Sequence, residues 1–252
     1  MLVSIIIPYY QCKDYISQSV NSVINQTYKN WELIIIDDEN SRSSESLLNK
    51  IKSKHNNIKI FSTKTNVGVG LARNLGIKKS KGTFVAFLDS DDYWQKNKLN
   101  KQIIFLKKNN ADICYTGYAA FYNNKITYKP ITPSFINYEN FLKECPVCCS
   151  SVLIKKKILQ KFKFKDYKNK EDYELWLRIA KKKIIFVGLK EYLTFYRIRK
   201  GSLSSFHLTK LINAFNIYKE QFGFKFFFIS FCIARLYINA LKKRFFINNN
   251  NY

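Results

Sequence analysis

Short apolar runs alternate with amphipathic stretches through the first half of the chain. This alternation is typical of βαβ units, whose parallel strands are buried on both faces of a sheet. The pattern therefore predicts an α/β fold with a mainly parallel, doubly wound sheet. The expected strands are Val3–Ile7, Leu33–Ile36, Ile58–Phe61, Phe84–Leu88 and Ile113–Tyr115.

Four helices are expected between these strands, because apolar residues recur there at helical spacing. Asp14 is a candidate N-cap of the first helix. The third helix is expected from Val69 to about Lys79, with a stop at Gly82. The apolar faces of the other three contain Ile16, Val20, Val23 and Ile24; Leu47, Leu48 and Ile51; and Leu99, Ile103 and Leu106.

The pattern becomes less regular in the second half of the chain. Pro130 and Pro133 interrupt residues 116–165, which favours a mixed, β-rich region there. Helical spacing then predicts a helix over Glu171–Lys183, and an apolar run predicts a strand over Ile184–Val187.

Acidic residues follow two of the expected strands, namely Asp37-Asp38 and Asp89–Asp92. Ligands of doubly wound sheets bind at the carboxyl ends of the strands, so these residues lie where a ligand is expected. Three crowded carboxylates repel one another, and Mg²⁺ or Mn²⁺ would neutralise them while bridging to substrate phosphates. The alternative is a solvated turn in which Asp91 or Asp92 caps a helix that begins near Asn97.

The charge balance favours an anionic partner, since 43 Lys and Arg against 18 Asp and Glu give a net charge of +25. Composition alone does not choose among nucleic acid, phospholipid and a phosphorylated substrate. A nucleic-acid-binding protein would explain the charge, but acidic strand ends would repel phosphate unless they held a metal. We therefore expect no nucleic-acid partner.

The N-terminus and the cysteines place the chain in a reducing compartment. Met1–Tyr10 has neither a basic start nor a small-residue cleavage site, so we expect no signal peptide and a cytoplasmic protein. Cys145 and Cys148 form a CxxC pair, but no second pair accompanies it, and the histidines are His55 and His207. We expect reduced thiols and neither a disulfide framework nor a zinc site.

Six segments form an ordered series along the chain. They are Ser4–Tyr10, Ser22–Tyr28, Asp37-Asp38, Asn66–Gly76, Asp89-Ser90-Asp91 and Glu171–Arg178. In this order they resemble the family-2 inverting glycosyltransferases of the GT-A fold, the nucleotide-diphospho-sugar transferase type. The resemblance spans residues 1–206 and implies that residues 1–115 bind a nucleotide-sugar, most often a UDP-sugar, and that residues 116–206 form the acceptor half.

The resemblance also implies roles for single residues. Asp172 would be the catalytic base, and Asp91 with Asp89 would hold Mn²⁺ or Mg²⁺. The metal would neutralise the departing diphosphate while the base takes the acceptor's proton during in-line, inverting attack. From spacing alone, Glu171 and Asp172 are equally well explained as first-turn acids favoured by the helix dipole. The residues implied to contact the donor are Pro8, Asp37, Asp38, Arg73, Asp89 and Arg197.

The chain departs from the family pattern in two places. Glu39 stands where the family usually has Gly after the two aspartates, and Arg199 stands at the usual His of a segment that runs from Tyr196 to Ser204. A nucleotidyltransferase of related fold remains an alternative, although the glycine-rich loop expected after its first strand is absent. A non-catalytic relative of the family is another.

Residues 207–252 form a basic, aromatic tail that is expected to be helical. Its most apolar stretch has nine uncharged residues between Lys225 and Arg235, which is about 14 Å of helix and roughly half a bilayer core. With Lys242-Lys243-Arg244 nearby, we expect a peripheral helix on an anionic inner membrane face, beside a glycan or lipid-linked acceptor. The alternative is a helix packed on the catalytic domain or on another subunit.

Overall fold

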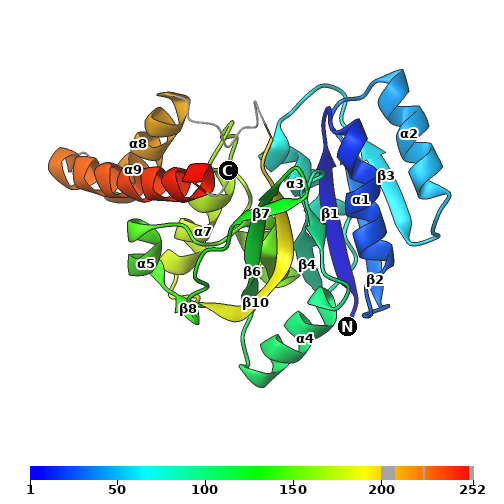
Figure 1. Cartoon of the computed structure of the whole chain (residues 1–252), viewed down its shortest axis with the longest axis horizontal. Helices are drawn as coiled ribbons and strands as arrows, with labels where there is room; N and C mark the ends of the chain where they lie inside the picture. Colours follow the sequence, from blue (N-terminus) through cyan, green and yellow to red (C-terminus); the bar gives the residue numbers. More distant parts are fainter. Residues whose placement is uncertain (200–207, 224, 250–252) are drawn as a thin grey trace.

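The computed structural model describes residues 1–199, 208–223 and 225–249. In this part of the chain, ten strands form one sheet at the centre of the molecule (Figure 1). The sheet order is β3-β2-β1-β4-β9-β6-β10-β5, while β7 pairs with β6 and β8 pairs with β10. The strands are β1 Val3–Tyr9, β2 Trp31–Asp37, β3 Ile58–Ser62, β4 Phe84–Phe87, β5 Tyr93–Trp94, β6 Ile113–Tyr122, β7 Lys125–Tyr128, β8 Phe135–Ile136, β9 Val152–Lys155 and β10 Phe186–Arg197.

Parallel pairings contain most of the paired residues of the sheet, as the sequence predicts, although five of the nine strand pairings in the described residues are antiparallel. Strands β3, β2, β1 and β4 run parallel, and β6 runs parallel to β10. β9 lies antiparallel between β4 and β6 and joins the two parallel groups. All five strands expected in the first half form, but the strand expected over Ile184–Val187 begins at Phe186 and continues to Arg197.

Helices follow most strands. They are α1 Lys13–Ile24, α2 Arg42–Lys52, α3 Val69–Lys79, α4 Lys98–Lys108, α5 Tyr138–Lys143, α6 Lys156–Lys161, α7 Glu171–Lys181, α8 Leu208–Phe222 and α9 Phe226–Asn249, with a 3-10 turn η1 at Cys149–Ser151. The cap expected at Asp14 is wrong, because the N-cap of α1 is Cys12 and Asp14 lies in the first turn. α4 is preceded by Asn97 as its N-cap, so neither Asp91 nor Asp92 caps it.

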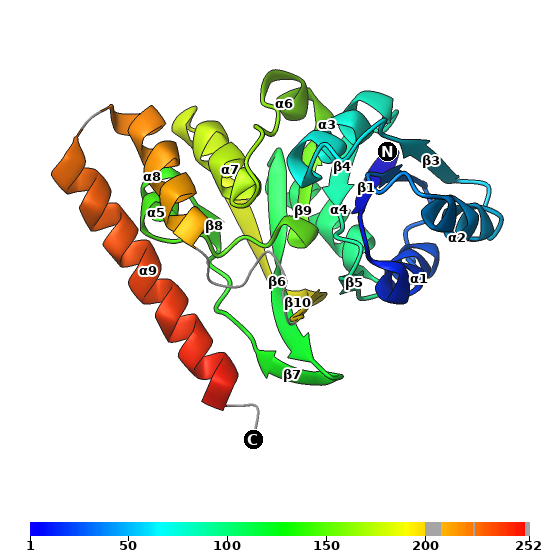
Figure 2. The ribbon, with the colours of Figure 1, turned by 90° about the horizontal axis from the view of Figure 1, so that it is seen from above.

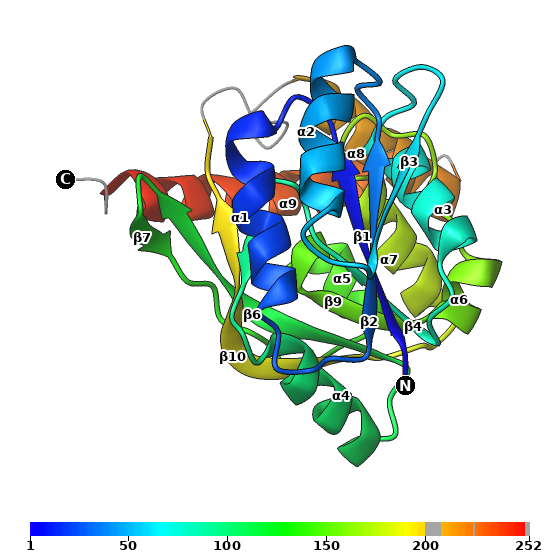
Figure 3. The same cartoon turned by 90° about the vertical axis from the view of Figure 1, so that its right-hand side faces the viewer.

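The helices cover both faces of the sheet, and each face has its own apolar core. On β1, Ile5 and Ile7 face the core shared with α1, α2 and α4, whereas Ile6 faces the core shared with α3, α6 and α7. Figure 3 shows α1 and α2 on one side of β1 and β2, and α3, α6 and α7 on the other. α3 packs closely on β1, since a Cβ atom at Gly76 would lie 2.5 Å from Cγ2 of Ile6.

The C-terminal helices pack against the second of these cores. Ile217 and Tyr218 of α8 are fully buried, and Ile229 and Cys232 of α9 join the same cluster. The hydroxyl of Tyr218 lies 2.7 Å from that of Tyr173 in α7. Figure 2 shows α8 between α7 and the long helix α9 at the edge of the molecule. Among the described residues, no helix is both long enough and apolar enough to cross a membrane.

Candidate active site

The acidic loops meet at one edge of the sheet, because the strands that precede them are neighbours. β1 lies between β2 and β4, with Tyr9 paired to Asp37 and Ile6 paired to Phe87. Pro8 is buried in β1 and lies opposite Ile36 in the register. The loops that follow β1, β2 and β4 therefore begin side by side, as the strand-end argument predicts.

Asp37 holds the loop after β2 in shape. It is 2% exposed, and its Oδ1 accepts hydrogen bonds of 3.1 Å from the backbone N–H groups of Glu39 and Asn40. Its Oδ2 accepts a bond of 2.7 Å from the hydroxyl of Ser44 in the first turn of α2. These bonds fix the turn at Asn40, whose φ is +50°. Asp37 thus shapes the wall of the site from inside the loop.

Asp38 links the same loop to the start of α3. Its Oδ1 accepts bonds from the Thr63 hydroxyl at 2.8 Å and the Val67 N–H at 2.9 Å, and its Oδ2 accepts a bond from the Gly68 N–H at 2.9 Å. Gly68 is the N-cap of α3 and has φ +86°, a conformation that favours glycine. Asp38 therefore fixes how the start of α3 meets the loop after β2.

Glu39 connects two strand-end loops. Its Oε2 accepts a bond of 2.9 Å from the N–H of Gln11, and its Oε1 accepts one of 2.8 Å from the Ser41 hydroxyl. Gln11 lies after β1 and has φ +45°. Glu39, which stands where the family usually has Gly, thus links the loops after β1 and β2.

Arg73 joins three elements of the site. Its Nη2 donates to Oδ1 of Asp89 and its Nη1 donates to Oε1 of Glu171, both at 2.6 Å. The Arg73 side chain is 2% exposed. A Cβ atom at Gly70 would lie 2.9 Å from the backbone oxygen of Lys165, so α3 lies close to the segment that leads into α7. Through this arginine, the start of α7 is held beside the loop after β4.

The three aspartates after β4 differ in exposure. Asp92 is 1% exposed, and its carboxylate accepts bonds from the Ser150 hydroxyl at 2.6 Å and the Arg197 N–H at 2.9 Å. The side chains of Asp89 and Asp91 are 29% and 15% exposed. Burial is the largest cause that raises the pKa of Asp92 well above its usual value, and the negative charges of Asp91 and Asp89 raise it further. Asp92 therefore fixes the loop, and Asp89 and Asp91 are the carboxylates that solvent can reach.

The end of β10 closes over this loop. Arg197 donates from Nε to the backbone oxygen of Asp91 at 2.9 Å, and its guanidinium carbon lies 4.4 Å from the ring centre of Tyr15. Two residues later, Nε of Arg199 lies 2.7 Å from Oδ2 of Asp91. The remainder of the expected motif, residues 200–204, lies outside the described residues.

Asp172 lies in the first turn of α7, next to the residue that Arg73 binds. Its Oδ1 accepts a bond of 2.7 Å from the N–H of Tyr173. Burial is the largest cause that raises the pKa of Asp172 to about 7, followed by the charge of Glu171, while Arg73 lowers it. A carboxylate that titrates near neutral pH is suited to accept a proton in catalysis.

The sequence and the fold of the chain both match those of known proteins. The family model for "Glycosyl transferase family 2" matches residues 4–188. The chain belongs to glycosyl transferase family 2. This confirms the resemblance drawn from the ordered motifs.

Individual members and structures agree with this assignment. A similar family-2 enzyme is the UDP-Glc:alpha-D-GlcNAc-diphosphoundecaprenol beta-1,3-glucosyltransferase WfaP of Escherichia coli, which is 38% identical over 247 residues, 97% of this chain and 96% of WfaP. The fold matches that of S. aureus TarS 1-349 in complex with UDP-GlcNAc, with a TM-score of 0.72 at 22% identity over 88% of this chain and 67% of TarS. It also matches the mannosyltransferase PcManGT of Pyrobaculum calidifontis in complex with GDP-Man and Mn²⁺, with a TM-score of 0.68 at 13% identity over 87% of this chain and 63% of PcManGT. These matches confirm the predicted GT-A fold.

The donor set of this family-2 glycosyltransferase fits a hard divalent cation. Asp89 and Asp91 offer carboxylate oxygens, and their mutual charge, after burial, raises the pKa of Asp91. Among the described residues, no three Asp, Glu, His or Cys side chains are grouped to hold an ion. Two carboxylates suffice for Mg²⁺ or Mn²⁺ where water and diphosphate oxygens complete the shell.

Sequence analysis of the glycosyltransferase missed two serines that build the site. Ser150 of η1 donates to Asp92 and accepts a bond of 3.0 Å from the N–H of Asp89. Ser19 of α1 donates to the backbone oxygen of Ser90 at 2.9 Å. Neither serine belongs to a motif, and their partners lie 58 to 71 positions away. No local pattern could have identified them.

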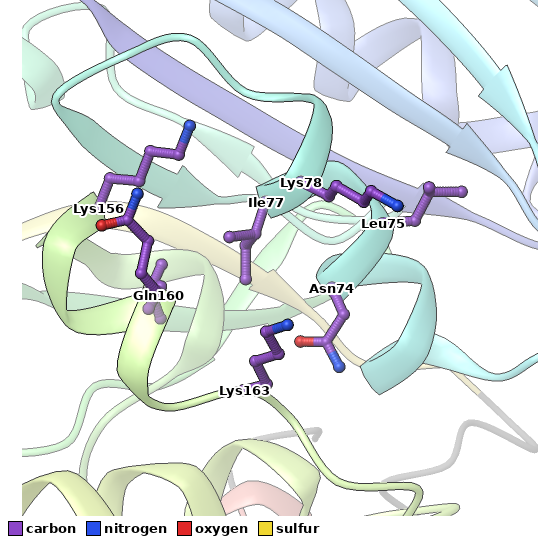
Figure 4. Close-up of a pocket in the computed structure, with 8 residues that line it drawn as sticks. Asn74, Leu75, Ile77, Lys78, Lys156, Gln160 and Lys163 are labelled. Carbon is purple, nitrogen blue, oxygen red and sulfur yellow. The ribbon is translucent and has the colours of Figure 1, made fainter.

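A separate hollow of about 400 Å³ lies between α3 and α6 (Figure 4). Three lysines contribute to its walls, which makes it basic, whereas the site at the strand ends is acidic. None of the carboxylates described above lines it. Its residues are Asn74, Leu75, Ile77, Lys78, Lys156, Leu159, Gln160 and Lys163.

Proposed function

We propose that the chain transfers a sugar from a UDP-sugar to a hydroxyl of a lipid-linked glycan precursor, with inversion at the anomeric carbon. The observation that carries this proposal is the position of Arg73, which binds Asp89 beside the accessible aspartates and Glu171 beside Asp172. One buried arginine thus holds Asp89, a candidate metal ligand, and the start of α7, which contains the candidate base Asp172, in one site.

The donor half of the site is assigned to the loops after β1 and β2 and to Arg73. In this assignment Asp38, with Asp37 and Pro8 behind it, lies beside the nucleobase, and Arg197 and Asp89 lie toward the diphosphate and sugar. The complex of TarS with UDP-GlcNAc supports a UDP-sugar for a fold of this kind.

The chemistry assigned to the site separates two tasks. Mn²⁺ or Mg²⁺ held by Asp89 and Asp91 would supply positive charge that stabilises the leaving diphosphate. Asp172 accepts the proton of the attacking hydroxyl, and its raised pKa places it among groups that do so near neutral pH. Arg73 positions Asp172 through Glu171 and does not itself touch the reacting atoms.

The acceptor class is inferred from WfaP, which acts on alpha-D-GlcNAc-diphosphoundecaprenol. The likeness extends over 97% of this chain and 96% of WfaP, so it includes both halves and the tail. We therefore assign glucose as the sugar to test first, and a GlcNAc-diphospho-lipid as the acceptor.

The test combines purified full-length chain, UDP-glucose, a GlcNAc-diphospho-lipid and Mn²⁺. The expected result is a metal-dependent product whose new linkage has the β configuration by NMR, inverted from the α-linked donor. Asp91→Ala is expected to abolish turnover, and EDTA is expected to weaken UDP binding in calorimetry. Retained configuration, or equal UDP affinity with and without EDTA, would contradict the mechanism. Other UDP-sugars, tested in parallel, determine which sugar is used.

The tail is assigned to a membrane surface. α9 has two faces: Ile229 and Cys232 are buried, whereas Phe227 is 89% exposed and Phe231 is 62% exposed. Ile238 continues the exposed face at helical spacing and is 51% exposed. Large apolar side chains on one exposed helix face favour the interface of a bilayer, and the net charge of +25 favours an anionic leaflet. The chain would then be a peripheral protein at the inner face of the cell membrane.

Point substitutions test this assignment better than truncation, because α8 forms part of the core. Phe227→Ser with Phe231→Ser is expected to reduce co-sedimentation of the full chain with vesicles of anionic phospholipid, and added salt is expected to weaken the binding of the parent. Ile131→Ser, at an apolar residue that is 87% exposed between β7 and β8, is the matched control. Equal sedimentation of all three proteins would rule out α9 as the anchor.

A further inference from the structure

Arg199 forms an ion pair with one of the two accessible aspartates of the site. Its Nε lies 2.7 Å from Oδ2 of Asp91, whose side chain is 15% exposed. The guanidinium carbon also lies 5.7 Å from the ring centre of Tyr15. The pair therefore lies at the mouth of the acidic site, where the side chain of Arg199 is itself 33% exposed.

The backbone before Arg199 is fixed by bonds to the same loop. The N–H of Arg197 donates to Oδ1 of Asp92, and the N–H of Ile198 donates to the backbone oxygen of Phe121 at 2.9 Å. The Arg197 guanidinium is held between the rings of Tyr15 and Phe121, at 4.4 and 4.5 Å from their centres. These contacts hold the end of β10 in place, so that Arg199 lies beside Asp91.

We propose that Arg199 occupies Asp91 in place of the metal and moves to the donor's diphosphate when the metal binds. This inference rests on the proposed function. A guanidinium and a divalent cation cannot both neutralise one carboxylate oxygen at full strength, so they compete for Asp91. Once displaced, a guanidinium beside a diphosphate forms strong, charge-assisted hydrogen bonds, which lysine forms less well.

The competition predicts opposite effects of Arg199 on two binding steps. Without nucleotide, Arg199 opposes the metal, because the ion pair must be broken first. With UDP present, Arg199 favours the ternary complex, because its charge gains a diphosphate partner. A residue that served only to stabilise the fold would not change the two affinities in opposite directions.

Mn²⁺ binding to the full chain, followed by the EPR spectrum of free Mn²⁺, measures the first step without any turnover. Arg199→Ala is expected to bind Mn²⁺ up to about fivefold more tightly than the parent when nucleotide is absent, since a partly exposed ion pair is worth up to about 1 kcal/mol. Arg199→His is expected to bind Mn²⁺ more tightly still, because imidazole can act as a ligand. Arg199→Lys keeps the charge and is expected to stay near the parent. Lys107→Ala, on the exposed end of α4, controls for the loss of one positive charge.

UDP binding in the presence of saturating Mn²⁺, measured by calorimetry, gives the second step. Arg199→Ala is expected to lose at least about fivefold in UDP affinity, with Arg199→Lys between it and the parent. Unchanged or weaker Mn²⁺ binding by Arg199→Ala in the absence of nucleotide overturns the competition, and unchanged UDP affinity overturns the movement to the diphosphate. A parent protein that binds no UDP with Mn²⁺ contradicts the proposed function instead, while the Mn²⁺ titration still tests the ion pair.

Discussion

Arg73 donates a hydrogen bond of 2.6 Å from Nη1 to Oε1 of Glu171, a residue 98 positions later in the chain. The Glu171 carboxylate is 9% exposed, and the guanidinium is 2% exposed. Arg73→Met would leave Glu171 without this partner and Asp89 without its own. We expect a loss of about 3 to 5 kcal/mol in the free energy of unfolding, because breaking a buried ion pair from one side leaves a charge unpaired. Urea denaturation measures it.

The matched control is the double variant Arg73→Met with Glu171→Gln. It removes the charge that the single variant leaves unpaired, so it should recover part of the lost stability although it contains one more substitution. A double variant less stable than Arg73→Met by the full cost of Glu171→Gln would show that the two residues do not interact.

Asp172→Asn should lose at least ~10²-fold in kcat while UDP binding stays near that of the parent, since an amide cannot accept the proton. For the parent, kcat/KM should fall as the pH drops below about 7, because only the ionised carboxylate acts as base and its pKa is raised to about 7. Activity within a few-fold of the parent would reduce Asp172 to a first-turn acid. Steady-state rates across the pH range, with calorimetry of UDP binding, decide between the two.

The same substitution should stabilise the fold above neutral pH. The pKa of Asp172 is higher in the folded chain, about 7, than the unfolded value of about 3.9, so the folded state binds the proton more tightly. The stability that this proton contributes is complete below the unfolded pKa and is lost as the pH rises through the folded one. As the pH rises from 5 to 8, the free energy of unfolding of Asp172→Asn should therefore increase relative to that of the parent by at least about 1 kcal/mol. A constant difference in urea denaturation across that range would contradict the raised pKa.

Lys98 is fully buried at the start of α4, where its Nζ donates to Oε1 of Gln102 at 2.7 Å and lies 3.9 Å from the ring centre of Trp94. Burial lowers its pKa to about 7. The unfolded chain keeps this proton up to about pH 10.4, so between about 7 and 10 the parent becomes more stable as the pH rises. Lys98→Met should be more stable than the parent at pH 7, and this advantage should shrink by pH 9.5. An advantage that stays constant or grows would show that Lys98 is charged in the fold.

Local patterns predicted the parts of the fold that depend on neighbouring residues. The limits of α3, Val69 and Lys79, agree with the expected helix, because its helical stretch is bounded by loop residues on both sides. The sequence did not predict β9 as a separate strand of the mixed region, since its place between β4 and β6 depends on pairing with strands about 40 and 70 residues earlier. The length of β10 was missed for the same reason: its second half pairs with β5 and β6, and its own composition is mixed.

The sequence identified candidate site residues by their type but not by their partners. Asp89, Asp91 and Asp172 stand out because carboxylates after a buried strand or at a helix start are conspicuous in a sequence. That Arg73 binds Glu171, or that Asp92 accepts bonds from Ser150 and Arg197, depends on contacts between segments far apart in the chain. Such contacts produce no periodic pattern in the sequence, so the sequence identifies the residues but not the contacts that each of them makes.

The bond between the Arg197 N–H and Asp92 spans 105 positions, and Arg197 also reaches Gln18, 179 positions earlier. Closing loops of this length costs chain entropy before any contact rewards it, so such contacts form late in folding. The parallel strands β1 to β4 need no residue beyond Phe87 to pair with one another. During synthesis, the sheet formed by β1 to β4 can thus assemble first, and the acidic loop after β4 acquires its final geometry only after β10 has been made.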